Sequence, residues 1–151
     1  MKATIRHIVW RFCETTPEYP ELADRQKLYV RSPADVVQNF RFLFHQIVHE
    51  RFVCLWLNTA NRVMGLTVVS EGTLNSSLVH PREVFRDAIV ATSASIIVMH
   101  NHPSGNPEPS QEDITITRQL VESGKVLGIP VHDHVIIAED GYTSFAERGL
   151  L

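Results

Sequence analysis

The chain has 151 residues, a length that fits one domain spanning residues 1–151 and allows a sizeable buried core. Its hydrophobic fraction of 44% is ordinary for a globular protein, and none of its apolar runs is long enough to cross a bilayer, so no membrane partner is expected. The net charge of −3, without a dense basic run, permits a nucleic-acid partner but does not indicate one, because non-specific DNA binding depends on lysine and arginine.

Cysteine content and the N-terminus both bear on the cellular compartment. Cys13 and Cys54 are too few for a disulfide framework or a cysteine-based zinc site. Residues 1–7 lack the apolar stretch and the small-residue cleavage site of an export signal. We therefore expect a cytoplasmic protein.

The first 31 residues are predicted to form strands and a loop. Residues 3–13 are rich in β-branched and aromatic side chains, which favour a strand. Two prolines place residues 14–24 in a loop, and residues 27–31 are a short strand in this interpretation.

An amphipathic helix is predicted over residues 33–48. Ser32 is a favourable N-cap, and a proline follows it at the first helical position. Apolar residues then recur at helical spacing, namely Val36, Val37, Phe40, Leu43, Phe44, Ile47 and Val48.

The rest of the chain alternates predicted strands and helices. The expected strands cover residues 51–57, 62–69, 93–99, 129–137 and 142–145, the first two forming a hairpin around a turn at 58–61. A loop is expected over 70–79, a helix from His80-Pro81, and a helix over 110–123 that ends near Gly124. This alternation predicts an α/β fold, a mixed α+β sandwich.

The segment from His100 to Asp113 has the composition of a metal site. Two histidines with one residue between them follow the apolar strand, and a Pro/Gly-rich loop leads to Asp113 at the next helix. Side chains two residues apart on a strand share a face, so His100 and His102 would project together if the strand continues through His102. Two imidazoles and one carboxylate are a ligand set of catalytic zinc, which keeps a fourth position for water.

A simpler interpretation of part of this segment stays open. Ser110 lies three residues before Asp113, and this pattern is also a capping box. In that case Ser110 and Asp113 only begin a helix, and the two histidines are loop residues. The adjoining His-x-His-Pro sequence favours the metal site, and a carboxylate has two oxygens with which to serve both roles.

A second His-x-His pattern lies at His132 and His134. Strand alternation predicts that these two side chains share one face and that Asp133 takes the other. Apolar residues flank the pair, and no carboxylate at a helix start follows it. We therefore expect packing, or support of the metal site, rather than direct ligation.

These residues resemble the JAB/MPN metalloprotease superfamily, whose JAMM motif is Glu…His-x-His-Pro…Ser-x-x-Asp. The chain is most similar to the RadC proteins, from about Ser32 to the C-terminus, so residues 32–151 would be a RadC-like core. The similar stretches are Gly72–Asn75, Val79–Phe85, His100–Gly105 and Asp133–Ile136. The resemblance implies the JAB/MPN fold, which is cytidine-deaminase-like, with a mixed sheet flanked by about three helices.

One feature of the longer RadC proteins is not expected in this chain. Those proteins carry an N-terminal helix-hairpin-helix region associated with DNA binding. The residues 1–31 that precede the similar part are instead predicted as strands and loop. The family's link to DNA repair therefore has less support here.

The resemblance also assigns roles to site residues. It implies that His100, His102 and Asp113 hold a Zn²⁺ ion. The family's catalytic glutamate lies after the first helix at the opening of the next strand, where this chain has Glu50. Ser110 corresponds to the family serine that helps to stabilise an oxyanion.

Local sequence alone does not single out Glu50, and Glu71 and Glu83 are rivals for the same role. The expected function is that of a zinc-dependent metallopeptidase or isopeptidase, with Glu50 as general base and a peptide or protein as substrate. Two alternatives stay open. One is a metal-binding interaction module in a DNA repair or maintenance pathway, and the other is a metal-dependent hydrolase or nuclease that cleaves non-amide bonds.

Overall fold

The computed structural model describes residues 28–72 and 79–151. Their helices are α2 (Pro33–Phe40), the 3-10 helix η1 (Arg41–Phe44), α3 (Pro81–Val90) and α4 (Gln111–Leu127). Their strands are β1 (Glu50–Leu57), β2 (Val63–Gly72), β3 (Ser95–Asn101), β4 (Val131–Ala138) and β5 (Gly141–Ser144). The strand expected over residues 3–13 and the loop expected over 14–24 lie outside the described residues.

The five strands form one mixed sheet in the order β2-β1-β3-β4-β5. β1 pairs antiparallel with both β2 and β3, β3 pairs parallel with β4, and β5 returns antiparallel to β4. The predicted hairpin and the predicted α/β fold class are both confirmed. β3 is the central strand, and all of its residues are buried.

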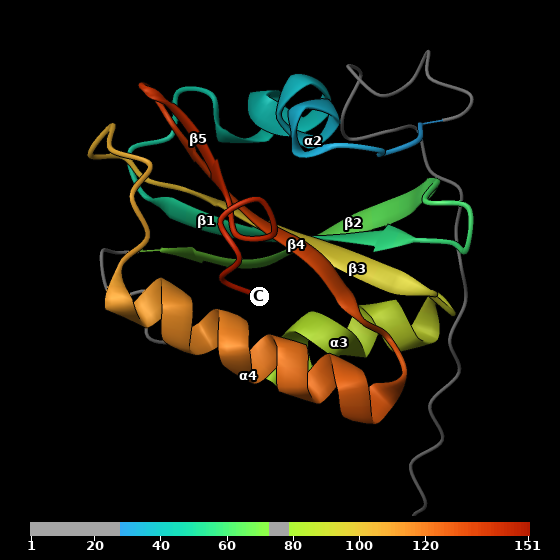
Figure 1. Ribbon diagram of the computed structural model, residues 1–151. Coiled ribbons are helices and arrows are strands. Elements are labelled where there is room, and N and C mark those ends of the chain that lie inside the picture. Colours follow the sequence, from blue (N-terminus) through green and yellow to red (C-terminus); the bar gives the residue numbers. More distant parts are fainter. Residues whose placement is uncertain (1–27, 73–78) are drawn as a thin grey trace, which may run out of the picture.

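Helices cover the sheet on both faces, α2 and η1 on one and α3 and α4 on the other (Figure 1). Alternate residues of β1 and β3 supply the two apolar cores: Val53, Leu55, Ile97 and Met99 pack on the α2 side, and Phe52, Cys54, Ile96 and Val98 on the α4 side. Each fully buried aliphatic or aromatic side chain stabilises the fold by about 1.5–3 kcal/mol. The two cores therefore stabilise the sheet that carries the site side chains at its end.

The first helix is shorter than predicted, so the expected end at residue 48 is wrong. The α-helix ends at Phe40, η1 continues it only to Phe44, and Gln46 has a φ of 59°. A residue in this left-handed conformation cannot continue a right-handed helix. The chain turns here into β1, which makes Glu50 the first residue of a strand.

Other element bounds differ from expectation by a few residues. β3 begins and ends two residues later than predicted, which brings His100 into the strand. The predicted strand over 27–31 reduces, within the described residues, to a single bridge between Tyr29 and Arg62. None of the helices in residues 28–72 and 79–151 combines the length and apolarity that crossing a bilayer requires.

Helix α4 continues past Gly124 and ends at Gly128, whose φ is 69°. The expected stop at Gly124 is therefore wrong. A Cβ at Gly124 would lie 2.5 Å from the carbonyl oxygen of Ile129, so this glycine allows the helix to pack closely on the chain that enters β4.

Candidate metal centre

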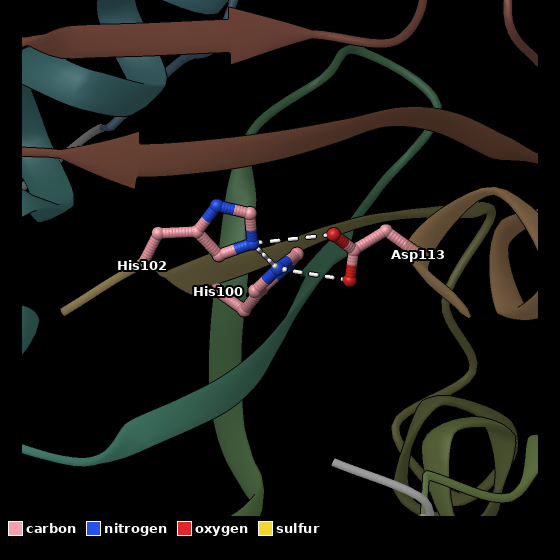
Figure 2. A group of neighbouring side chains, drawn as sticks. All are labelled: His100, His102 and Asp113. Carbon is pink, nitrogen blue, oxygen red and sulfur yellow. Dashed lines mark hydrogen bonds and ion pairs between the residues drawn. The ribbon is translucent and has the colours of Figure 1, made fainter. Parts of the chain in front are cut away.

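Two elements of the α4 side of the sheet bring together three residues that could hold a metal ion. His100 lies at the end of β3, and Asp113 lies in the first turn of α4. The backbone N–H of His102 donates to the carbonyl of Ile137 on β4 at 2.9 Å, so the chain stays paired one residue past the end of β3. The two histidines consequently project toward the same carboxylate (Figure 2).

The three side chains present their ligand atoms to one point. The Nε2 atoms of His100 and His102 lie 2.9 Å apart. Each Nε2 is 3.2 Å from a different carboxylate oxygen of Asp113. Within the described residues, this is the group of histidine, cysteine and acidic side chains whose ligand atoms could hold a metal ion, all of them within 4.8 Å of one another.

The capping box is present as well, so the two interpretations of Ser110 and Asp113 are compatible. The backbone N–H of Asp113 donates to Ser110 Oγ at 3.1 Å, and the backbone N–H of Ser110 donates to Asp113 Oδ2 at 2.8 Å. These bonds hold the carboxylate in a fixed orientation at the start of α4. Burial raises the pKa of Asp113, but hydrogen bonds from His100 and His102 lower it more, and the net effect is a pKa well below the usual range.

The hydrogen bonds of His102 indicate which of its nitrogens faces the site. Its Nδ1 lies 2.9 Å from the carbonyl oxygen of Asn106, which can only accept, so Nδ1 carries the hydrogen. The Nε2 of a neutral His102 then directs a lone pair toward Asp113. Burial lowers the pKa of His102, but the hydrogen bonds to Asp113 and Asn106 outweigh that effect and the pKa is raised.

This arrangement concentrates electron-pair donors around one point and therefore favours a cation at that point. In the metal-free protein a proton on an imidazole can fill that role. Two imidazole nitrogens and a carboxylate oxygen are also a donor set that suits zinc. The residues present thus fit the group that the sequence predicts.

The second His-x-His pattern is split by a bulge in β4. Ile96 pairs with Val131 and Ile97 pairs with Asp133, so His132 is an extra residue between them. The expectation that His132 and His134 share a face is wrong, because His132 is exposed whereas His134 is fully buried. The Nε2 of His134 lies 2.8 Å from Nδ1 of His100, on the side of that ring away from Asp113.

Glu50 lies at the same end of the sheet as the two histidines. Phe52 on β1 is paired with His100 on β3 in an antiparallel ladder, so Glu50, two residues earlier, comes opposite His102 and on the same face. The charge of Glu50 contributes to raising the pKa of His102. Glu50 is half-buried in this position.

The two rival glutamates are placed differently. Glu71 pairs with Arg51, whose side chain alternates to the other face of β1, and the two side chains form an ion pair. Glu83 lies in the first turn of α3.

Asn101, the residue between the two histidines, connects β3 to the start of β1. Its side-chain oxygen accepts from the backbone N–H of Arg51 at 2.8 Å, and its amide nitrogen donates to the carbonyl of His49 at 3.0 Å. These contacts hold the backbone on both sides of Glu50. Asn101 was not among the site residues predicted from the sequence, although its position in a strand between the two histidines implies a side chain on the opposite face.

Comparison with known proteins agrees with the geometry. Residues 30–150 match the RadC-like JAB domain family. The chain is 53% identical over 126 residues to a UPF0758 protein of Salinibacter ruber, covering 83% of this chain and 54% of that protein. It is 47% identical over 135 residues to the UPF0758 protein YsxA of Bacillus subtilis, covering 87% of this chain and 57% of that protein. The chain thus spans about half the length of the curated relatives it matches. By family match and by relatives, it belongs to the RadC-like JAB domain family.

Proposed function

We propose that this protein is a metal-dependent hydrolase in which His100, His102 and Asp113 hold zinc. The observation that carries the proposal is the convergence of the two imidazole Nε2 atoms on one carboxylate, at distances of 2.9 and 3.2 Å. The glutamate opposite His102 adds a group that can move a proton at the same place. The family supports the assignment, because the JAB/MPN superfamily includes metalloproteases.

The proposed reaction is hydrolysis of a peptide or isopeptide bond. Zinc, when bound, would act as a Lewis acid that lowers the pKa of water and polarises a carbonyl group. The Glu50 carboxylate would accept a proton from the attacking water and later return it to the leaving amine. Asp113 cannot take this role, because its oxygens face the two histidines and its pKa is lowered.

Glu50 is preferred to Glu71 as the base because of the face on which each lies. Glu50 shares its face with His100 and His102, by the pairing of β1 with β3. Glu71 is held by Arg51 in an ion pair. That ion pair directs the Glu71 carboxylate toward Arg51, on the face of β1 opposite to the two histidines.

Ser110 would stabilise the oxyanion that forms on the substrate carbonyl. Its Oγ accepts a hydrogen bond from the backbone N–H of Asp113, which uses a lone pair and not the hydroxyl hydrogen. Ser110 is exposed at the start of α4, where a substrate can reach it. Its hydroxyl can therefore donate to a developing negative charge.

The proposed substrate is a peptide or protein, and the proposed compartment is the cytoplasm. The amide class of substrate is supported by the glutamate-plus-metal chemistry and by the family. The compartment is supported by the cysteine content, since two cysteines are too few for a disulfide framework.

Metal content tests the ligand assignment. Purified protein should hold about one zinc per chain, because a single three-ligand site is proposed. His100→Ala, His102→Ala and Asp113→Ala should each lose most of it, as measured by plasma emission spectroscopy after dialysis against metal-free buffer. His132→Ala is the matched control and should keep zinc, since His132 is exposed. Full zinc retention in all three ligand variants would exclude this site.

Substitution of the proposed base tests the reaction. Glu50→Gln should bind zinc like the wild type but lose about 10²–10⁴-fold in the rate of amide hydrolysis, the usual effect of removing a general base. Glu71→Gln is the control and should keep most of the rate. The assay is cleavage of a panel of peptide and isopeptide substrates by the zinc-loaded protein. A Glu50→Gln variant with wild-type rates would show that the base lies elsewhere.

A further inference from the structure

A polar chain of two buried residues lies behind the metal centre. His134 is fully buried between two phenylalanine rings: Phe145 stacks on it at 4.7 Å and Phe52 meets it edge-on at 5.5 Å. A polar ring in such apolar surroundings destabilises the protein unless its nitrogens are hydrogen-bonded. Both nitrogens of His134 have partners: Nε2 contacts Nδ1 of His100 at 2.8 Å, and Nδ1 contacts Oγ1 of Thr117 at 2.6 Å.

Thr117, at the end of this series of hydrogen bonds farthest from His100, determines where the hydrogens of the series lie. Thr117 is fully buried on α4, and its Oγ1 is 2.6 Å from the main-chain carbonyl oxygen of Asp113, one helical turn earlier. A carbonyl oxygen can only accept a hydrogen bond, so the single hydroxyl hydrogen of Thr117 points to Asp113. The hydroxyl oxygen is then left to accept from His134, and Nδ1 of His134 must carry a hydrogen.

The hydrogen on Nδ1 of His134 in turn determines where the hydrogen of His100 lies. His134 is fully buried between the rings of Phe52 and Phe145, surroundings that disfavour a charged imidazole, so its ring is neutral and its Nε2 is bare. A bare Nε2 must accept, and the hydrogen comes from Nδ1 of His100. The Nε2 of a neutral His100 then presents a lone pair toward Asp113 and His102. That is the form of imidazole that binds a metal ion.

The opposite direction of donation along these hydrogen bonds is unfavourable. If Thr117 donated to His134, its oxygen would face the Asp113 carbonyl oxygen at 2.6 Å with no hydrogen between them. His134 would then donate from Nε2 to His100, and a hydrogen on Nε2 of His100 would occupy the place of the metal. Three hydrogen bonds therefore select the tautomer of His100.

We propose that His134 and Thr117 are positioning residues that hold His100 in its metal-binding tautomer, starting from the backbone carbonyl of Asp113. The inference rests on the metal site of the proposed function but not on any catalytic activity. Partners behind a ligating histidine commonly change metal affinity by about 10–100-fold when they are removed. A similar loss is expected here when the chain of hydrogen bonds is interrupted at Thr117.

A matched pair of substitutions tests the proposal. Thr117→Val keeps the shape of the side chain but removes the hydroxyl, and it should weaken zinc binding by about 10–100-fold in competition with a fluorescent chelator. Thr117→Ser keeps the hydroxyl and should bind zinc within a few-fold of the wild type. Circular dichroism confirms that each variant is folded. Equal zinc affinity in folded Thr117→Val, Thr117→Ser and wild-type protein would overturn the proposal.

The tautomer of His100 gives a second, direct readout that needs no variant. Imidazole ¹⁵N chemical shifts of the metal-free wild-type protein, recorded at about pH 8 where an ordinary imidazole is neutral, should show the hydrogen of His100 on Nδ1. A neutral His100 ring with its hydrogen on Nε2 would overturn the proposal even if Thr117→Val does not fold. Failure of the wild type to bind zinc would instead contradict the proposed function, and the shifts would still report the tautomer.

Discussion

His102 and Asp113 have pKa values displaced in opposite directions. The pKa of His102 is raised although burial acts against it, because Asp113 and Asn106 accept hydrogen bonds from the ring. The pKa of Asp113 is lowered although burial would raise it, because a protonated imidazole of His100 or His102 hydrogen-bonds to its oxygens and favours the charged carboxylate. In metal-free protein a proton on an imidazole and the charge on Asp113 therefore stabilise each other, and zinc competes with that proton.

The sign of the pH dependence follows from these directions. A raised pKa means that His102 stabilises the folded state below its unfolded value of about 6.5 and that this contribution is lost as the pH rises through the folded pKa. Asp113 has a lowered pKa, so its contribution is present above about pH 3.9 and is lost only in stronger acid. Both contributions are present from about pH 4 to 6.5.

For metal-free protein in excess EDTA, we expect the free energy of unfolding to decrease as the pH rises from about 6 to 8, as measured by urea denaturation. His102→Gln should flatten this part of the pH profile. Zinc affinity should change in the opposite direction and increase over the same range, because the metal needs deprotonated imidazoles. Identical pH profiles for wild type and His102→Gln would contradict the assignment of the titration to His102.

The element that orients Glu50 is β1, and its first residues are held by β3. The Asn101 side chain bonds to the backbone of His49 and of Arg51, so it keeps the strand in place on both sides of Glu50. Asn101 itself is buried. Without its amide, two main-chain groups near the site would lose their partners.

We expect Asn101→Ala to lower the unfolding free energy by about 1–3 kcal/mol, because main-chain groups are left without hydrogen bonds. It should leave zinc affinity within a few-fold of wild type but reduce the hydrolysis rate, since Glu50 is less well oriented. Urea denaturation, chelator competition and the amide-cleavage assay measure the three effects.

Asn39→Ala is the control. The Asn39 amide donates to the carbonyl of Asp35 within α2, on the far side of the sheet, and its loss should not change hydrolysis. A normal rate in folded Asn101→Ala would exclude this role.

Local patterns predicted the elements that hold the candidate ligands. The spacing of His100 and His102 on a strand, and the Ser110 and Asp113 cap, are short-range features that the sequence displays directly. Glu50 could be selected only by family resemblance, because its proximity to His102 depends on the pairing of β1 with β3. The sequence pattern did not predict the break at Gln46, because apolar residues continue at helical spacing to Val48. It also did not predict the contact of Thr117 with His134, which joins a helix to a strand.

At the scale of the whole molecule, the metal centre would join the sheet to α4. His100 and His102 come from β3 and the chain just after it, and Asp113 comes from the helix. The two elements also meet through apolar contacts such as Leu120 with the β3 residues of the same core, and through the contact of Thr117 with His134 on β4. A bound metal ion would add a further connection, at the end of β3.

We expect zinc to raise the thermal stability of the whole protein. A ligand that binds only the folded state, present at 1,000 times its dissociation constant, stabilises by about 4 kcal/mol. At about 2–4 °C per kcal/mol for a protein of this size, zinc should raise Tm by roughly 10 °C relative to protein in EDTA. Differential scanning calorimetry measures the shift. Asp113→Ala should show little shift, and a similar shift in that variant would place the stabilising metal at another site.

The bulge at His132 has a consequence for how β4 can vary in length. Val131 and His134 are three residues apart, yet both pack on the α4 side, so the alternation of inward and outward side chains changes phase between them. Removing His132 would restore a regular strand and keep His134 behind His100. Removing a residue after His134 would instead shift the pairing of β4 with β3. That part of β4 accepts the hydrogen bond from the backbone N–H of His102, where the next loop begins. We therefore expect a one-residue deletion at His132 to be tolerated, whereas a deletion a few positions later in the same strand should disturb the candidate metal centre.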